Sequence, residues 1–151
     1  TAVAPAHFAM TTNAGAGTIG ASATNYYGAG YALVADTTEA NAAIKARTRS
    51  SFTNLQVNVT ANNRSDGTTC DFRAGSASPS GGPTVSVGAS TTGIIEDLVG
   101  RYVTATTDLI NYRIITGAGT GTITVTTLGC SQFGVASAPP HRSQRFFRRA
   151  A

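Results

Sequence analysis

Short segments rich in Thr, Val and Ile fill residues 52–133, and turns rich in Gly, Asn, Asp, Pro and Ser separate them. The clearest segment contains Leu55, Val57 and Val59, which point one way along an extended chain while the polar residues between them point the other. About eight strands of this length, joined by such turns, are typical of a sandwich or barrel. We therefore predict an all-β fold, an antiparallel β-sandwich or jelly roll of about eight strands.

Three further segments have less regular patterns, from which we predict a hairpin, a bent strand and a strand start. Asp66 and Gly67 favour a turn with positive φ, which would make residues 68–74 the return strand of a hairpin. Apolar doublets in residues 94–107 indicate two short strands bent near Gly100. Residues 36–45 fit either a short helix with a capping box or the start of a strand, and we favour the strand because the segment runs directly into the next one.

The chain divides into three parts. Residues 1–23 are rich in Ala, Gly and Thr without helical or strand periodicity, so we expect an extended N-terminal arm that becomes ordered on a partner. A glycine pattern in this arm, G-x-G-x-x-G at 15–20, has no strand before it and no helix after it, which indicates a flexible stretch rather than a dinucleotide site. Residues 24–133 form the jelly-roll domain, and residues 134–151 form a C-terminal tail.

The positive charge lies in the tail. Four of the 11 basic residues are Arg142, Arg145, Arg148 and Arg149, which leaves seven basic residues to balance the seven acidic ones elsewhere. The sequence pI of about 9.5 is therefore a property of the tail and predicts no nucleic-acid-binding face on the domain. Charged residues make up only 12% of the chain, which favours close packing against neighbours over life as a free monomer.

Candidate chemistry is sparse. Glu96 and Asp97 are adjacent, so on a strand they point to opposite faces and do not form an acid–base pair. Asp66 and Asp71 lie in no dense carboxylate loop, and His7 and His141 lie in the two extensions without fixed neighbours. We expect no enzyme, no cofactor and no metal.

The two cysteines, Cys70 and Cys130, are too few for a disulfide scaffold. Spacing leaves open whether they form one bridge, and two buried thiols are the expectation for a protein made in a cytosol. The N-terminal residues lack the features of a signal peptide, and no apolar run approaches the roughly 20 residues of a membrane span, so no membrane partner is expected.

Three motifs follow one another in the domain: NLQVNV at 54–59, TGIIED at 92–97 and DLINY at 108–112. In this order, with TGAGTGTITV after them, they resemble a group of predicted bacteriophage structural proteins. The resemblance covers residues 26–133 and excludes the arm and the tail. It implies a jelly roll of the tumour-necrosis-factor/C1q type, which commonly trimerises, and a virion component on the capsid surface, assembled in the host cytoplasm.

Three functions follow from these features. The first is a capsid decoration or cement protein that binds the major capsid protein, or another virion protein, through its extensions. The second is a head- or tail-fibre module that binds a receptor glycan, for which the candidate tyrosines are Tyr26, Tyr27, Tyr31 and Tyr102. The third is a surface filament in which the arm adds a strand to the next subunit.

The tail is the predicted partner-binding site. Its arginines would pair with acidic groups while Phe146 and Phe147 enter an apolar pocket, because Arg and aromatic residues dominate protein interfaces. The site residues are Arg142, Arg145, Phe146, Phe147, Arg148 and Arg149. The alternatives are a solvated chain end, or weak and salt-sensitive nucleic-acid binding that nothing on the neutral domain reinforces.

Overall fold

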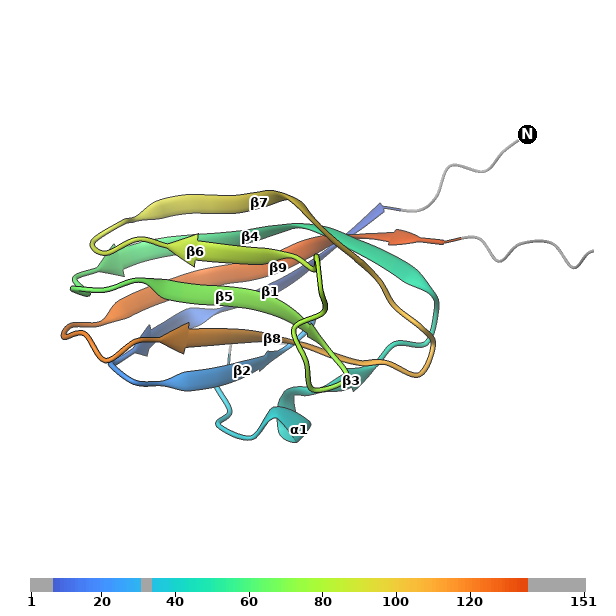
Figure 1. The fold of residues 1–151 in the computed structure, drawn as a ribbon, viewed down its shortest axis with the longest axis horizontal. Helices are drawn as coiled ribbons and strands as arrows, with labels where there is room; N and C mark the ends of the chain where they lie inside the picture. Colours follow the sequence, from blue (N-terminus) through green and yellow to red (C-terminus); the bar gives the residue numbers. More distant parts are fainter. Residues whose placement is uncertain (1–6, 31–33, 136–151) are drawn as a thin grey trace, which may run out of the picture.

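The computed structural model describes residues 7–30 and 34–135, which form two antiparallel β-sheets packed face to face (Figure 1). The first sheet contains, in spatial order, β1 (His7–Ile19), β9 (Ile123–Gly134), β4 (Ser50–Asn62) and β7 (Gly93–Val103). The second contains, in spatial order, β2 (Thr24–Gly28), β8 (Leu109–Thr116), β5 (Thr68–Ala74) and β6 (Thr84–Val87). The two-residue strand β3 (Ile44–Lys45) also pairs with β8.

The strand order is that of a jelly roll. The links β1–β2, β3–β4, β4–β5, β6–β7, β7–β8 and β8–β9 each run from one sheet to the other. Such crossing links wrap one long antiparallel ribbon around a shared core, as in double-sheet jelly rolls. The predicted fold class is confirmed, with short β3 as an addition to the eight main strands.

The core lies between the sheets. Leu55, Val57 and Val59 are buried as their alternation predicted, and each large apolar side chain that is fully buried contributes about 1.5–3 kcal/mol. Phe52 of β4 stacks on Phe72 of β5 with ring centroids 4.6 Å apart, which joins the two sheets. Apolar contact across the sandwich therefore holds the two layers together.

The predicted arm is largely a strand of the domain. His7–Ile19 forms β1, which pairs with β9 from His7 opposite Phe133 to Ile19 opposite Ile123. The register shifts between Asn13 and Gly17, so the glycine stretch forms an irregularity within the strand. The expectation that this region lacks a strand was wrong, because backbone pairing with β9 requires no side-chain alternation.

The hairpin predicted after β4 was also wrong. Residues 68–74 do form a strand, β5, but it pairs with β6 and β8 in the opposite sheet. Gly67 lacks the expected positive φ. A connection that crosses the sandwich does not need the tight primed turn that joins paired strands.

The segment 36–45 contains both of the elements considered for it. A single helical turn, α1 (Glu39–Ala42), comes first and β3 follows, so the preference for a strand was wrong for its first half. The capping box does not form, since the N-cap residue Thr38 makes no side-chain cap. Instead the Thr38 N–H donates to Asp36 Oδ1 at 2.7 Å.

The predicted bend near Gly100 is a bulge inside one continuous strand. Thr53 of β4 lies opposite Arg101, whereas Leu55 lies opposite Asp97. Three residues of β7 therefore face one residue of β4, Asn54, whose φ of 49° is in the left-handed region that Asn tolerates. This bulge determines which side chains of β7 face solvent.

Candidate functional site

The predicted tail site, comprising Arg142, Arg145, Phe146, Phe147, Arg148 and Arg149, lies outside the described residues, as do His141 and Tyr31. The point from which the tail departs is described. Phe133 near the end of β9 lies opposite His7 of β1 on one side and Ser51 of β4 on the other. The Val135 N–H donates to the Arg49 carbonyl at 3.0 Å, so the chain is held as far as residue 135.

An ion pair on the second sheet uses one of the carboxylates considered for metal binding. Arg113 of β8 lies opposite Asp71 of β5, with Nε 3.1 Å from Oδ1 and Nη2 2.5 Å from Oδ2. Ser78 Oγ donates to Asp71 and accepts from Arg113 Nη2 at 2.9 Å. This bidentate geometry satisfies the buried carboxylate and ties loop 75–83 to the sheet.

A second pair joins α1 to the same sheet. Arg73 Nε lies 2.6 Å from Glu39 Oε1, and Arg73 Nη2 lies 3.0 Å from Oε2. The hydrogen bond from Arg73 lowers the pKa of Glu39 and so favours its charged form. Asn111 Nδ2 donates to the same carboxylate at 3.2 Å. This pair therefore links the helical turn, of which only Ala42 is buried, to the second sheet.

Arg64 fastens two loops together. Its side chain is 0% exposed, pairs with Asp66, and donates through Nη2 to the carbonyls of Gly117 (2.9 Å) and Gly119 (3.2 Å). The Gly119 N–H donates to Asp66 Oδ2 at 2.8 Å, and this bond lowers the pKa of Asp66. Glycine is required at 121, where φ is +92° and a Cβ would lie 2.3 Å from the Asn63 carbonyl oxygen. The turn at 117–121 is therefore built around a buried guanidinium.

The bulge of β7 is held by Asp97. Its Oδ1 accepts from the N–H groups of Val99 (2.9 Å) and Gly100 (2.8 Å), and its Oδ2 accepts from the Thr84 N–H at 2.8 Å. Burial raises the pKa of Asp97, but these three hydrogen bonds together lower it below the usual value. A Cβ at position 100 would lie 2.6 Å from Pro83 Cα, so the close approach requires Gly100. Asp97 thus caps the bulge.

Apolar side chains on this strand face solvent. Ile94 is 63% exposed, Leu98 74% and Val99 92%, and we call these three residues the β7 ridge. The doublet pattern predicted a bend here, but it did not predict which side chains would leave the core. The interruption of alternation immediately before Gly100 is the sequence signal for them.

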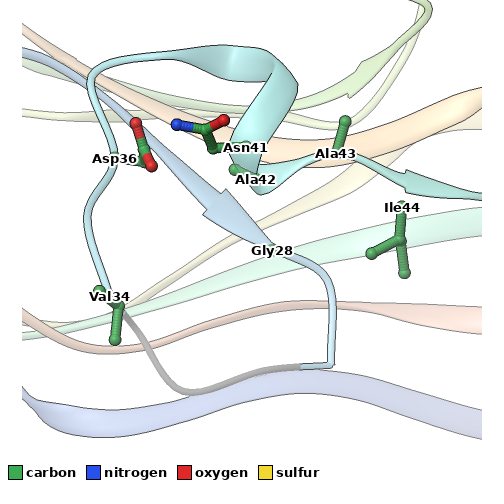
Figure 2. Close-up of a pocket in the computed structure, with 7 residues that line it drawn as sticks. All are labelled: Gly28, Val34, Asp36, Asn41, Ala42, Ala43 and Ile44. Carbon is green, nitrogen blue, oxygen red and sulfur yellow. The ribbon is translucent and has the colours of Figure 1, made fainter.

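A cavity of about 440 Å³ lies beside α1, between the end of β2 and the chain from Val34 to Asp36 (Figure 2). Its walls are mainly small and apolar, and Asp36 and Asn41 add a carboxylate and a carboxamide. This combination offers hydrogen bonds to the hydroxyl groups of a small polar molecule. The lining residues are Gly28, Val34, Asp36, Asn41, Ala42, Ala43 and Ile44.

The described candidate tyrosines do not form an exposed cluster. Tyr27 is buried, and desolvation raises its pKa to about 12. Tyr26 is half-buried under the Arg73 guanidinium, 5.8 Å from its ring centroid. Tyr102 is half-buried and donates from its hydroxyl to Asp108 Oδ2 at 3.1 Å. These side chains serve the packing of the sandwich.

Cys70 and Cys130 are both free and buried, so the disulfide left open by their spacing is not formed in the structure. Burial raises the pKa of each thiol to about 12, which keeps both in the unreactive protonated form. Over residues 7–30 and 34–135, no group of three or more His, Cys, Asp and Glu side chains is placed to hold a metal ion. Within the same ranges, no helix has the length and hydropathy needed to cross a bilayer.

Comparisons with protein-family models, with curated proteins and with solved structures found no match. The fold class thus rests on the strand topology, and the resemblance to phage structural proteins stays a prediction.

Proposed function

We propose that this chain is a structural protein of a phage virion, a decoration or cement protein that binds the assembled head through its tail. The observation that carries the proposal is that charged side chains are paired inside the fold while large apolar side chains are exposed on its surface. Charged side chains pair with one another within the fold, whereas the apolar side chains of the β7 ridge face solvent. The ion pairs are Arg64–Asp66, Arg73–Glu39 and Arg113–Asp71. Rigid apolar groups on a surface with little charge favour protein contacts.

The outer face of the first sheet supports the same proposal. Leu55 and Val57 point into the core, so Gln56 and Asn58 point outward. Their cross-strand partners on β9 are Gly129 and Thr127, which are small and uncharged. The β4–β9 part of this face packs against a neighbour without the desolvation cost of charged groups, and the charge of Glu96 lies at its β7 margin, opposite Gln56. It is the surface we propose for contact with the shell or with further copies in a trimer.

Binding to capsids that lack the protein tests the proposal. Protein that binds only the assembled shell stabilises it by mass action, so the temperature at which the shell opens should rise with protein concentration. A variant ending at Val135 keeps the whole of β9, and we expect it to lose this effect. A variant with Lys at all four tail arginines is the matched control for charge alone.

Two results would contradict the proposal. The cement role is wrong if capsids withstand heat and internal pressure equally well with and without the protein. The tail is not the anchor if the variant ending at Val135 binds as tightly as the full chain.

The cavity beside α1 favours a second candidate, a glycan-binding fibre module. Asp36 and Asn41 would bind sugar hydroxyl groups there, and the Asn41→Ala variant should then lose binding on a glycan array. A few copies per particle, located on the tail, would support this function over a head decoration. An absence of glycan binding by the full chain would remove it.

The third candidate, a self-polymerising filament, requires His7–Ile19 to leave its own β9 and pair with another subunit. In the structure β1 pairs with β9 of the same chain. Electron microscopy of the purified protein remains the test, because fibres formed without capsids would indicate strand exchange.

A further inference from the structure

The β7 ridge is a built feature. Three hydrogen bonds to Asp97 and the close approach of Gly100 to Pro83 hold the bulge that turns Leu98 and Val99 outward. Of the large hydrophobic side chains exposed in the described part of the chain, Ile94, Leu98 and Val99 share this strand, whereas Val34 and Leu109 lie elsewhere. Isolated exposed apolar residues need no explanation, but three on one rigid edge strand form a contact surface.

The charge beside the ridge indicates what chemistry it accepts. Glu96 lies between Ile94 and Leu98 and is exposed, with its Oε1 accepting from Gln56 Nε2 at 2.6 Å. An occupant that is apolar at its centre and basic at its flanks therefore complements the ridge. The chain contains such a segment in residues 142–149, where Phe146 and Phe147 stand between arginines.

The segment is long enough to reach the ridge of its own molecule. Phe133 lies opposite Ser51, which lies opposite Val103, so β9 and β7 are two strand spacings apart, about 10 Å. The return along β7 from Val103 to Val99 adds four residues, about 13 Å. Residues 136–145 span about 33 Å when extended.

We propose that residues 142–149 dock on the β7 ridge of the same molecule, with Phe146 and Phe147 against Leu98 and Val99 and the flanking arginines near Glu96. The short connection gives an effective concentration in the millimolar range, which favours the same molecule over a second copy in dilute solution. The contact covers two apolar surfaces at once. If the proposed function holds, it keeps the anchor covered until the shell offers a competing site.

Engineered disulfides test the docking in the full chain without capsids. The pair Val99→Cys and Gln144→Cys keeps both Phe residues, and Cys at 99 remains a small apolar side chain. The matched control is Lys45→Cys with Gln144→Cys. Lys45 is exposed and lies four residues before Arg49, whose carbonyl holds Val135, so random collisions of the tail reach it at least as easily. The native thiols are buried and do not compete.

We expect the 99–144 bridge to form within single molecules at least about tenfold faster than the 45–144 bridge, because docking raises the local concentration. Equal rates for the two pairs would overturn the proposal. Covalent dimers in place of the internal bridge would also overturn it, and would show that the tail binds a second copy.

Limited proteolysis provides a readout that needs no new cysteine. Trypsin should cleave after Arg145 several-fold faster in the Leu98→Ser/Val99→Ser variant than in the unmodified chain, because the undocked tail is accessible. The Phe146→Ser/Phe147→Ser variant should behave in the same way. Equal cleavage rates in all three would overturn the docking. Since no capsid is present, failure here is distinct from failure of the proposed virion role.

Discussion

The second sheet and the β7 edge of the first sheet use their side chains in opposite ways. On the second sheet, Asp71 and Arg73 are buried and each is paired with a partner from a neighbouring segment. On β7, a carboxylate of the same kind, Asp97, caps a bulge that sends Leu98 and Val99 into solvent. In the first region the charged groups stabilise the fold by pairing with each other. In the second region a charged group stabilises a bulge that exposes apolar side chains.

This difference separates side chains that stabilise the fold from side chains that are available to a partner. A buried ion pair whose partners satisfy each other offers few free donors or acceptors to a ligand. A rigid apolar strand, in contrast, gains free energy only when something covers it. The contact surface of this molecule is therefore better sought on the β7 side than among its ion pairs.

Arg64→Met is the variant expected to show most strongly that the buried charged groups stabilise the fold. Removal of the guanidinium leaves the carbonyls of Gly117, Gly119 and Gly121 without their donor, whereas Asp66 keeps the Gly119 N–H, and we expect a loss of about 3–5 kcal/mol in the free energy of unfolding. Urea denaturation measures it. Arg47→Met, at an exposed position, is the control and should cost less than about 0.5 kcal/mol. Equal losses would show that Arg64 does not fasten the loops.

Two leucines beside the bulge sharpen the comparison directly. Leu55 is 0% exposed and Leu98 is 74% exposed. In a chain that ends at Val135, Leu55→Ala should cost about 3 kcal/mol through lost burial and a cavity, whereas Leu98→Ala should cost less than about 0.5 kcal/mol. Thermal and urea unfolding of both variants provide the measurement. A large loss at Leu98 would mean that the ridge belongs to the core.

The link between α1 and the second sheet is tested by Arg73→Met. The variant leaves Glu39 without its bidentate partner, and we expect a loss of about 2 kcal/mol because the pair is nearly but not wholly shielded from water. Hydrogen exchange should rise in residues 36–45 more than in β5 or β8. Uniform exchange changes across the sandwich would indicate that α1 is held by other contacts.

The smallest effect is expected for the bulge cap, in its dependence on pH. The pKa of Asp97 is lower in the folded protein than in the unfolded chain, so the unfolded state binds the proton first as pH falls. Its contribution is present above about pH 4 and is lost as pH falls through the folded-state pKa.

Asp97→Asn should therefore destabilise the protein by about 0.5–1 kcal/mol at pH 7 and by progressively less below pH 4. Urea titrations from pH 2 to 7 measure the difference. A deficit that does not change with pH would assign the effect to altered hydrogen-bond geometry and not to the charge.

Much of the core was predictable from local pattern. Leu55, Val57 and Val59 lie on one face of a strand, and their alternation selects that face wherever the strand is placed. β8 lies between β2 and β5, and the apolar residues on both of its faces are typical of such a central strand.

Strand pairing was not predictable in the same way. Residues 68–74 were assigned correctly as a strand but to the wrong sheet, because alternation carries no information on which neighbour a strand will bond. The strand His7–Ile19 was not predicted, because its own sequence lacks alternation. Its backbone hydrogen bonds are made with β9, which lies more than a hundred residues away in the chain.

The β7 ridge shows most clearly which features cannot be predicted from the sequence. The sequence by itself determined a charge-neutral β domain of Thr- and Val-rich strands, with basic and aromatic residues gathered at 142–149. Only the tertiary structure decided that Leu98 and Val99 face outward, because their direction depends on a register shift against Thr53 and Leu55 and on the cap from Asp97. At such a register shift the burial of a side chain depends on two strands together, and the sequence of one strand does not determine it.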